Sequence, residues 1–316
     1  MSKPVLAIGE ILIDLIVSDG APSLETAGAF ISRAGGAPAN AAVALARQGI
    51  PAAYCGVCGD DPFGNRLRSV LRSNGVDDGA LRSTSDADTT LAFAWKDARG
   101  DGHFRLLRLA DRLLGASDVE AAEVRNKAAL IAGSVSLATE PSRSAIVYAV
   151  EHASDAGVPV CLDLNVRPTL WPDLDDLRAA LAPLLPRTTL LKLSLDDAVH
   201  LYGNKTTPEQ IFIQAKELGI PLVVLTDGAR GCWYPDATGM PVFLPAFTID
   251  AVEPTGAGDA FTAAIISRLI TNGWSGISRD DAEYASAAGA LTAMRPGAME
   301  SLPTAGEIKE FLAGPH

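Results

Sequence analysis

Several residue types that would point to particular functions are scarce in this chain. Its 316 residues include 26 Lys and Arg against 38 Asp and Glu, a formal net charge of -12, and aromatic residues make up 6%. Proteins that bind phosphate backbones usually present a basic face, so nucleic-acid binding is not expected as the main role. No uninterrupted run of about 18 apolar residues occurs, so no membrane span is expected.

The N-terminal segment lacks the marks of a secretory signal peptide. Glu10 and Asp14 place charges inside its apolar run, and no small-residue cleavage site follows. We therefore expect a cytoplasmic protein.

Cysteine is also scarce, and of the four residues only Cys55 and Cys58 have CxxC spacing. A redox or zinc site needs an exposed turn or a second ligand pair. This pair lies instead in an apolar, strand-like stretch, and no second CxxC occurs. We expect buried structural thiols.

Short apolar runs alternate with amphipathic stretches along the chain. Strands are expected at residues 5–17, 53–57, 129–132, 158–164, 189–193 and 222–226. Helices are expected at residues 39–48, 64–73, 142–156, 177–185, 208–218, 261–271 and 280–294. The alternation predicts an α/β fold in three layers, with a central, mostly parallel sheet flanked by helices on both faces.

Two segments, residues 21–33 and 89–108, break this rhythm and resemble extended ribbons, the second with a turn at residues 98–102. Strands outside the βα repeats are expected to form a small β-sheet. Such a sheet would act as a lid over the carboxyl ends of the parallel strands, where open α/β sheets bind ligands. With lid strands at about residues 15–33 and 89–110, all 316 residues are expected to form a single domain.

The segment Thr255-Gly256-Ala257-Gly258-Asp259 precedes an apolar, helical run. Three residues without bulk leave backbone N–H groups exposed at a helix start, which suits an anion, and Asp259 places a carboxylate beside them. The arrangement suggests phosphoryl transfer to a hydroxyl. An ordinary helix start with Asp as cap is the alternative. It is not a Walker A loop, because GxxxxGK[ST] does not occur.

A second glycine segment, Gly35-Gly36-Ala37-Pro38-Ala39-Asn40, also precedes a helix. Paired glycines let a ligand approach the backbone, although a tight turn is the alternative. Together the two segments resemble the two signatures of the ribokinase/PfkB family of carbohydrate kinases. Two further segments are similar to the family, in the same order along the chain: Gly9-Glu10 with Asp14, and GDDPFG from Gly59. Three more are similar to its fructokinase branch: GSVSL from Gly133, DLNVR from Asp163 with Trp171, and RPGA from Arg295.

The resemblance implies a ribokinase-like fold and an ATP-dependent kinase that phosphorylates a primary hydroxyl of a sugar. Asp259 would accept the hydroxyl proton as a general base. The N–H groups of Gly256, Ala257 and Gly258 would stabilise charge on the transferring phosphoryl group. The residues implied to bind the sugar are Asp14, Gly35, Gly36, Asn40, Arg108 and Arg167.

The residues that the resemblance implies for ATP are Lys192, Ser194, Thr226, Gly228, Gly231 and Ser286. Asp197 stands where the family has a magnesium-associated Glu; being one methylene shorter, it would reach Mg²⁺ through water. Asp227 would point away from a triphosphate. Where the family reads Asp-Thr, this chain has Glu253-Pro254. Glu253 would offer oxygen to a monovalent cation such as K⁺, while Pro254 removes a backbone donor and fixes φ.

A fructokinase that makes fructose 6-phosphate is the leading hypothesis, because GSVSL and DLNVR resemble that branch. A 2-keto-3-deoxygluconate kinase is the closest alternative, followed by other PfkB sugar or nucleoside kinases. A non-catalytic sugar-binding relative is the alternative from another class, motivated by Glu253-Pro254, Asp197 and Ser286. The expected partners are a sugar, ATP with Mg²⁺, and a second copy of the chain bound through the lid.

Overall fold

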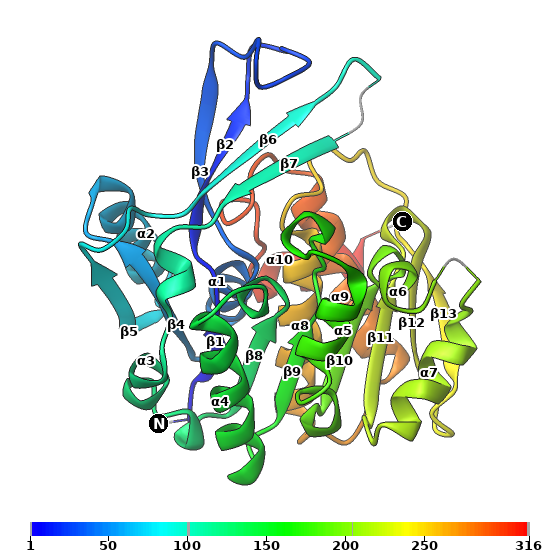
Figure 1. Ribbon diagram of the computed structural model, residues 1–316. Helices are drawn as coiled ribbons and strands as arrows, with labels where there is room; N and C mark the ends of the chain where they lie inside the picture. Colours follow the sequence, from blue (N-terminus) through cyan, green and yellow to red (C-terminus); the bar gives the residue numbers. More distant parts are fainter. Residues whose placement is uncertain (1, 100–101, 204, 315–316) are drawn as a thin grey trace.

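The large sheet contains nine strands in the order β13-β12-β11-β10-β9-β8-β1-β4-β5 (Figure 1). The computed structural model describes residues 2–99, 102–203 and 205–314. Neighbouring strands from β11 to β5 run parallel, and β12 and β13 add an antiparallel hairpin at one edge. The strands are β1 (Val5–Ile8), β4 (Ala52–Gly59), β5 (Asp77–Thr84), β8 (Ala129–Gly133), β9 (Val160–Asp163), β10 (Leu190–Ser194), β11 (Leu222–Thr226), β12 (Gly231–Pro235) and β13 (Pro241–Pro245).

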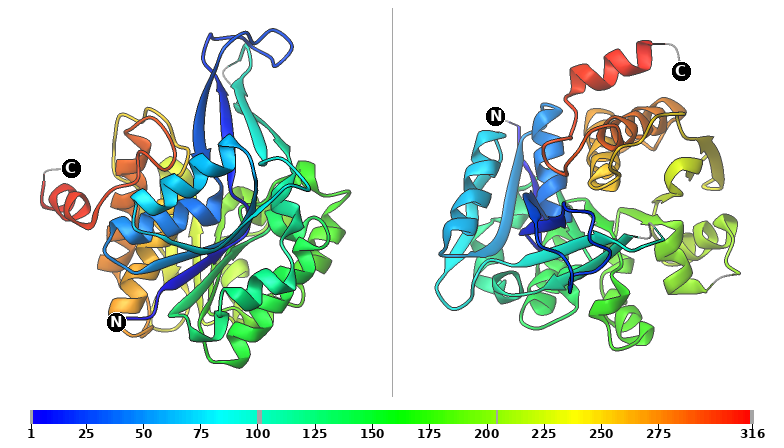
Figure 2. Two further views of the ribbon diagram at one scale, coloured as in Figure 1. Left: turned by 90° about the vertical axis from the view of Figure 1, so that its left-hand side faces the viewer. Right: turned by 90° about the horizontal axis from the view of Figure 1, so that it is seen from above.

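Helices cover both faces of this sheet (Figure 2). Because alternate strand residues point to opposite faces, Val5 and Ala7 of β1 pack in a core with α1, α2, α8, α9 and α10. Leu6 and Ile8 pack in a second core with α3 to α7. The helices are α1 (Ala37–Arg47), α2 (Pro62–Ser73), α3 (Ala116–Ala121), α4 (Ser142–Asp155), α5 (Leu174–Leu181), α6 (Leu195–Tyr202), α7 (Pro208–Glu217), α8 (Ala257–Thr271), α9 (Arg279–Ala293) and α10 (Ala305–Ala313). The three layers expected from the sequence are confirmed.

A separate small sheet stands beyond the carboxyl ends of the parallel strands (Figures 1 and 2). Its order is β3-β2-β6-β7, from β3 (Phe30–Gly35), β2 (Leu12–Val17), β6 (Leu91–Lys96) and β7 (Gly102–Leu107). The two expected ribbons therefore contribute strands to one sheet. Residues 21–29 are turns and irregular chain rather than strand. The expected turn at residues 98–102 includes residues 100 and 101, which lie outside the described residues.

The expected single strand at residues 5–17 is wrong, because the chain leaves one sheet and enters the other within it. β1 ends at Ile8, and Gly9 follows with φ +146°. A Cβ on Gly9 would lie 2.9 Å from Pro38 Cγ, so only glycine fits this crossing. The crossing places Glu10 and Asp14 where the two sheets meet.

Helix α8 begins at Ala257, four residues before the expected start at residue 261. Asp259 therefore lies inside the first turn of the helix rather than ahead of it. The sequence pattern also missed α3, α6, α10, β5 and the β12–β13 hairpin. Most of these elements are short or lie at the edges of the fold.

The four cysteines are free thiols and buried, as expected. Burial raises the pKa of Cys55 to about 12, so its thiol is inert at neutral pH. Over the described ranges, none of the helices combines the length and the apolar character needed to cross a membrane.

Candidate active site

A cavity of about 420 Å³ lies at the junction of the two sheets and the starts of α1 and α8. The described residues that line it are Glu10, Leu12, Asp14, Gly36, Ala37, Asn40, Phe104, Leu106, Val135, Asn165, Arg167, Lys192, Pro254, Thr255, Gly256, Gly258 and Asp259. The small sheet supplies Leu12, Asp14, Phe104 and Leu106. The cavity is thus formed by segments far apart in sequence, at the position where open α/β sheets bind ligands.

The turn before α8 explains the first glycine of this segment. The Ala257 N–H donates to the Pro254 carbonyl oxygen at 3.1 Å, and Gly256 has φ +83° and ψ -10°. These are the angles of the third residue of a type II turn, which glycine favours. Of the three N–H groups expected to face an anion, the one from Ala257 is therefore occupied. Within the described part of the chain, the N–H groups of Gly256 and Gly258 have no acceptor.

Asp259 lies in the first turn of α8, with 9% of its surface exposed. Asn40 Nδ2 donates to Asp259 Oδ2 at 2.7 Å, a contact between residues 219 positions apart. Burial and the charge of Asp163 raise the pKa of Asp259 to about 7, against the opposing effects of Asn40, Lys192 and Arg167. A carboxylate with a near-neutral pKa suits a general base, because it is partly ionised at neutral pH and accepts a proton readily.

The second carboxylate in the cavity, Asp14, belongs to β2. Burial and the charge of Asp259 raise the pKa of Asp14 to about 7. Its Oδ2 lies so close to Gly35 that a Cβ there would collide with it. A Cβ on Gly36, whose φ is +108°, would lie 2.5 Å from the Glu10 carbonyl oxygen. The paired glycines therefore let the chain pass Asp14 and Glu10 at close range.

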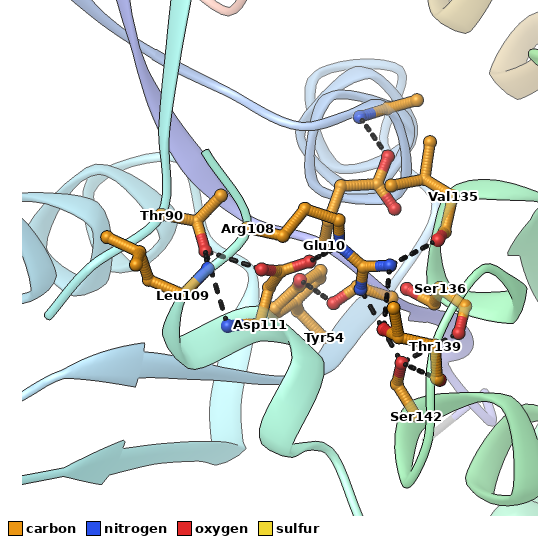
Figure 3. A network of polar contacts seen from close by, with 12 residues as sticks. Glu10, Tyr54, Thr90, Arg108, Leu109, Asp111, Val135, Ser136, Thr139 and Ser142 are labelled. Atoms are coloured by element: carbon orange, nitrogen blue, oxygen red, sulfur yellow. Dashed lines mark hydrogen bonds and ion pairs between the residues drawn. The ribbon is translucent and has the colours of Figure 1, made fainter. Parts of the chain in front are cut away.

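Arg108 is not in the substrate-facing position expected from the sequence. It is absent from the described residues that line the cavity, and its side chain is 7% exposed. Its Nε donates to Asp111 Oδ2 at 2.7 Å and its Nη1 to the Val135 carbonyl oxygen at 2.6 Å (Figure 3). Because Asp111 is fully buried, this ion pair keeps the guanidinium of Arg108 behind Val135, which lines the cavity.

Arg167, by contrast, lines the cavity. Its guanidinium carbon lies 5.7 Å from the centroid of the Phe104 ring, within the range of a cation–π contact. Phe104 belongs to β7, whereas Arg167 follows β9 of the large sheet. This contact therefore joins the two sheets across the cavity.

The residues predicted for ATP fall into two groups. Lys192 lines the cavity, and Ser194 is the N-cap of α6. Thr226 ends β11, Gly228 lies in the turn after it, and Gly231 begins β12. Ser286 Oγ lies 3.8 Å from the sulfur of Cys232, the residue after Gly231. None of this second group is among the described lining residues of the cavity. Asp227 accepts from Arg230 Nε at 2.6 Å.

The two residues predicted to serve metals have backbone partners. Asp197 Oδ1 accepts from the Val166 N–H at 2.7 Å, and Oδ2 accepts from the Ser194 N–H at 2.8 Å. Glu253 Oε2 accepts from the Gly297 N–H at 2.9 Å. Among the residues that the structure describes, no group of three or more His, Cys, Asp or Glu side chains could hold a metal ion.

Among the described lining residues, Glu10 is the charged one that the sequence placed in a strand and not in the site. It is 4% exposed, and its Oε1 accepts from the Ala37 N–H at 3.3 Å. Its Oε2 is buried without a partner in the described part of the chain. Burial raises the pKa of Glu10 to about 7. A carboxylate within an apolar run was the available signal, since buried charges are rare without a function.

A helix start with free N–H groups beside a buried carboxylate, at the carboxyl ends of a parallel sheet, defines an α/β phosphotransferase. The chain belongs to the PfkB family: the family model described as pfkB family carbohydrate kinase matches residues 2–305.

Relatives cover the whole chain. It is 35% identical to Fructokinase-1 from Zea mays over 314 residues, which is 98% of this chain and 97% of that protein. The crystal structure of fructokinase with bound ATP from Xylella fastidiosa is similar with a TM-score of 0.87 at 27% identity, over 99% of both chains. That of a putative ribokinase II in complex with ATP and Mg²⁺ from E. coli has a TM-score of 0.89 at 27% identity, again over 99% of both. The expected ribokinase-like fold is confirmed.

Proposed function

We propose that this protein is an ATP-dependent fructokinase, which transfers the γ-phosphoryl group of ATP to a primary hydroxyl of D-fructose and yields fructose 6-phosphate. The observation that carries the proposal is the contact between Asn40 and Asp259 at the cavity, 2.7 Å long. It joins a sugar-binding amide to a buried carboxylate directly beside free helix N–H groups. The fructokinase relatives support the choice of sugar.

In this mechanism Asp259 accepts the proton of the attacking hydroxyl as its bond to phosphorus forms. The N–H groups of Gly256 and Gly258 stabilise the negative charge that develops on the transferring group. Asp14, Gly35, Gly36, Asn40 and Arg167 bind the other sugar hydroxyls. Arg108 contributes by fixing the Val135 carbonyl in the cavity wall rather than by direct contact.

ATP binds through Lys192, Ser194, Thr226, Gly228, Gly231 and Ser286. Asp197 would hold Mg²⁺ through water, because each of its oxygens accepts one backbone N–H and keeps a further lone pair, and Mg²⁺ prefers carboxylate and water oxygens. When bound, the ion would neutralise charge on the phosphates.

The charges of the cavity favour a neutral sugar over an anionic one. Three lining residues are carboxylates, Glu10, Asp14 and Asp259, whereas the lining cations in the described chain are Arg167 and Lys192. Lys192 is already paired with Asp163. A 2-keto-3-deoxygluconate carboxylate would therefore find Arg167 as its one lining cation without an ion-pair partner in the described chain, among three carboxyl groups. A nucleoside base would find one lining aromatic ring, Phe104.

A coupled ADP-release assay over a sugar panel tests this proposal. With D-fructose, D-ribose, 2-keto-3-deoxygluconate and adenosine compared at equal concentrations, D-fructose should have the highest kcat/KM. A higher value for 2-keto-3-deoxygluconate would establish the alternative sugar. Measured sugar binding without turnover of any sugar would show a non-catalytic relative instead.

We further propose that K⁺ activates the enzyme through Glu253. Its Oε2 is held by the Gly297 N–H, which keeps the carboxylate beside the turn that leads into α8. The rate should be severalfold higher in potassium chloride than in tetramethylammonium chloride at equal ionic strength. Equal rates in the two salts would remove the proposal. Choline chloride as a third salt controls for a specific effect of tetramethylammonium.

The small sheet serves in this proposal as a lid over the sugar and as the contact between two copies of the chain. Four of its large apolar side chains are 37–49% exposed: Phe30, Ile31, Phe104 and Leu107. Exposed apolar surface of this kind supports a homodimer through the lid. The cytoplasmic location and the homodimer stay predictions from the sequence.

A further inference from the structure

Below the first turn of α8, polar side chains from three elements form a buried network. Asp163, the last residue of β9, pairs in register with Lys192 of β10. Lys192 Nζ lies 3.0 and 3.2 Å from the two carboxylate oxygens of Asp163. The Thr262 hydroxyl of α8 donates to Asp163 Oδ2 at 2.6 Å. One carboxylate thus ties two strands to the helix that carries Asp259.

Burial makes the members of this network depend on one another. The side chains of Lys192 and Asp163 are 8% and 9% exposed. Burial lowers the pKa of Lys192, but the charges of Asp163 and Asp197 outweigh it and the net shift is upward, so the ammonium stays protonated. Removing either member would leave the other as an unpaired buried charge, which is strongly unfavourable.

The network reaches the groups assigned to phosphoryl transfer. A Cβ on Gly258 would lie 3.3 Å from Lys192 Nζ, so the ammonium lies against the first turn of α8. Thr262 Oγ1 also lies 3.0 Å from the Gly258 carbonyl oxygen. A displacement of Asp163 would therefore move both the ammonium and the turn that presents the Gly258 N–H.

We propose that Asp163 is a positioning residue for phosphoryl transfer, which holds the Lys192 ammonium against Gly258 and, through Thr262, keeps the first turn of α8 aligned with the strands. The inference rests on the proposed kinase function. Asp163 and Thr262 are outside the described lining of the cavity, so both act through Lys192 and Gly258.

The charge of Asp163 also acts on the base, which gives the test a second readout beside the split between kcat and KM. The polar groups that face Asp259 are Asp163 from β9, Lys192 from β10, Arg167 after β9, Asn40 from α1 and Asp14 from β2. Burial and then the charge of Asp163 raise the pKa of Asp259. Asp163→Asn should therefore lower the pKa of Asp259 and move the acidic limb of the pH–rate profile to lower pH.

The test compares Asp163→Asn, Thr262→Val and Thr262→Ser by kcat, KM and the pH–rate profile. Asp163→Asn should lower kcat about 100-fold, the cost of displacing reacting groups by about 1 Å, with the sugar KM nearly unchanged. Thr262→Val removes a hydrogen bond and no charge, so kcat should fall about 10-fold while the acidic limb of the pH–rate profile stays at the same pH. Thr262→Ser keeps the hydroxyl and should restore the rate.

Asp281→Asn is the matched control, because Asp281 is also buried and pairs with Arg268 of α8 at 2.6 Å, at the opposite end of that helix. It should lower the melting temperature and leave kcat and the limb unchanged. If Asp163→Asn behaves in the same way, Asp163 is merely structural and the proposal fails. If Asp163→Asn does not fold, a Thr262→Val enzyme with the wild-type kcat overturns it. Absence of turnover in the wild type would refute the kinase function itself.

Discussion

Asp259→Asn is expected to lower kcat by about 10²- to 10⁴-fold, the range that a general base contributes, while the sugar and ATP still bind. Asparagine has the same shape and still accepts a hydrogen bond from Asn40, but it does not take up the proton of the attacking hydroxyl. Steady-state ADP release gives kcat, and calorimetric titration with the sugar gives binding. A nearly active variant would refute the base assignment.

Asp14→Asn is the matched control for this experiment. Asp14 has the same side chain, the same cavity and a pKa also raised to about 7, but it belongs to the sugar side. Its loss should appear mainly in the sugar KM, not in kcat. In the wild-type enzyme, activity should fall as the pH drops below about 7, because a carboxyl whose pKa is raised to about 7 becomes protonated there.

Gly36→Ala is expected to have the largest effect on the fold, lowering the free energy of unfolding by about 3 kcal/mol or more. The new Cβ would lie 2.5 Å from the Glu10 carbonyl oxygen and 2.9 Å from Ile11 Cα. Both are backbone atoms, which cannot rotate away as a side chain would. The strain would displace the crossing between the sheets, so the sugar KM should rise as well. Urea denaturation measures the first effect and steady-state kinetics the second.

Gly49→Ala is the control at a glycine of positive φ where no collision follows. Gly49 also has a positive φ, +82°, but a Cβ there would meet nothing within 4 Å. Its replacement should cost only the strain of a left-handed alanine, about 1 kcal/mol. If the two variants are equally stable, the close approach at Gly36 has no energetic importance.

The sequence predicted the architecture well where the signal was local. Apolar runs alternating with amphipathic stretches determine a parallel sheet with helices on both faces, and the structure contains it. The crossing at Gly9 was not predictable in this way, because Gly9 has a positive φ and lies against Pro38, which belongs to a distant segment of the chain. The start of α8 was placed too late, since glycines have low helix propensity and the turn at Pro254 compensates for it.

The site was predicted less completely than the fold. Asp14, Asn40, Arg167 and Asp259 come together at one cavity, as the resemblance implied. Arg108 does not, because its guanidinium pairs with the fully buried Asp111. The two residues are only three positions apart, but the sequence does not show that Asp111 is buried.

The small sheet supplies three apolar residues to the cavity wall, and helix α8 supplies the groups assigned to phosphoryl transfer. The first are Leu12, Phe104 and Leu106, and the second are Gly256, Gly258 and Asp259. This apolar wall and the transfer groups are therefore encoded in separate stretches of the gene. Evolution can therefore change the shape of this wall through substitutions in the strands while the first turn of α8 stays the same. A library of variants at these three wall positions would test how far the wall determines which sugar is accepted.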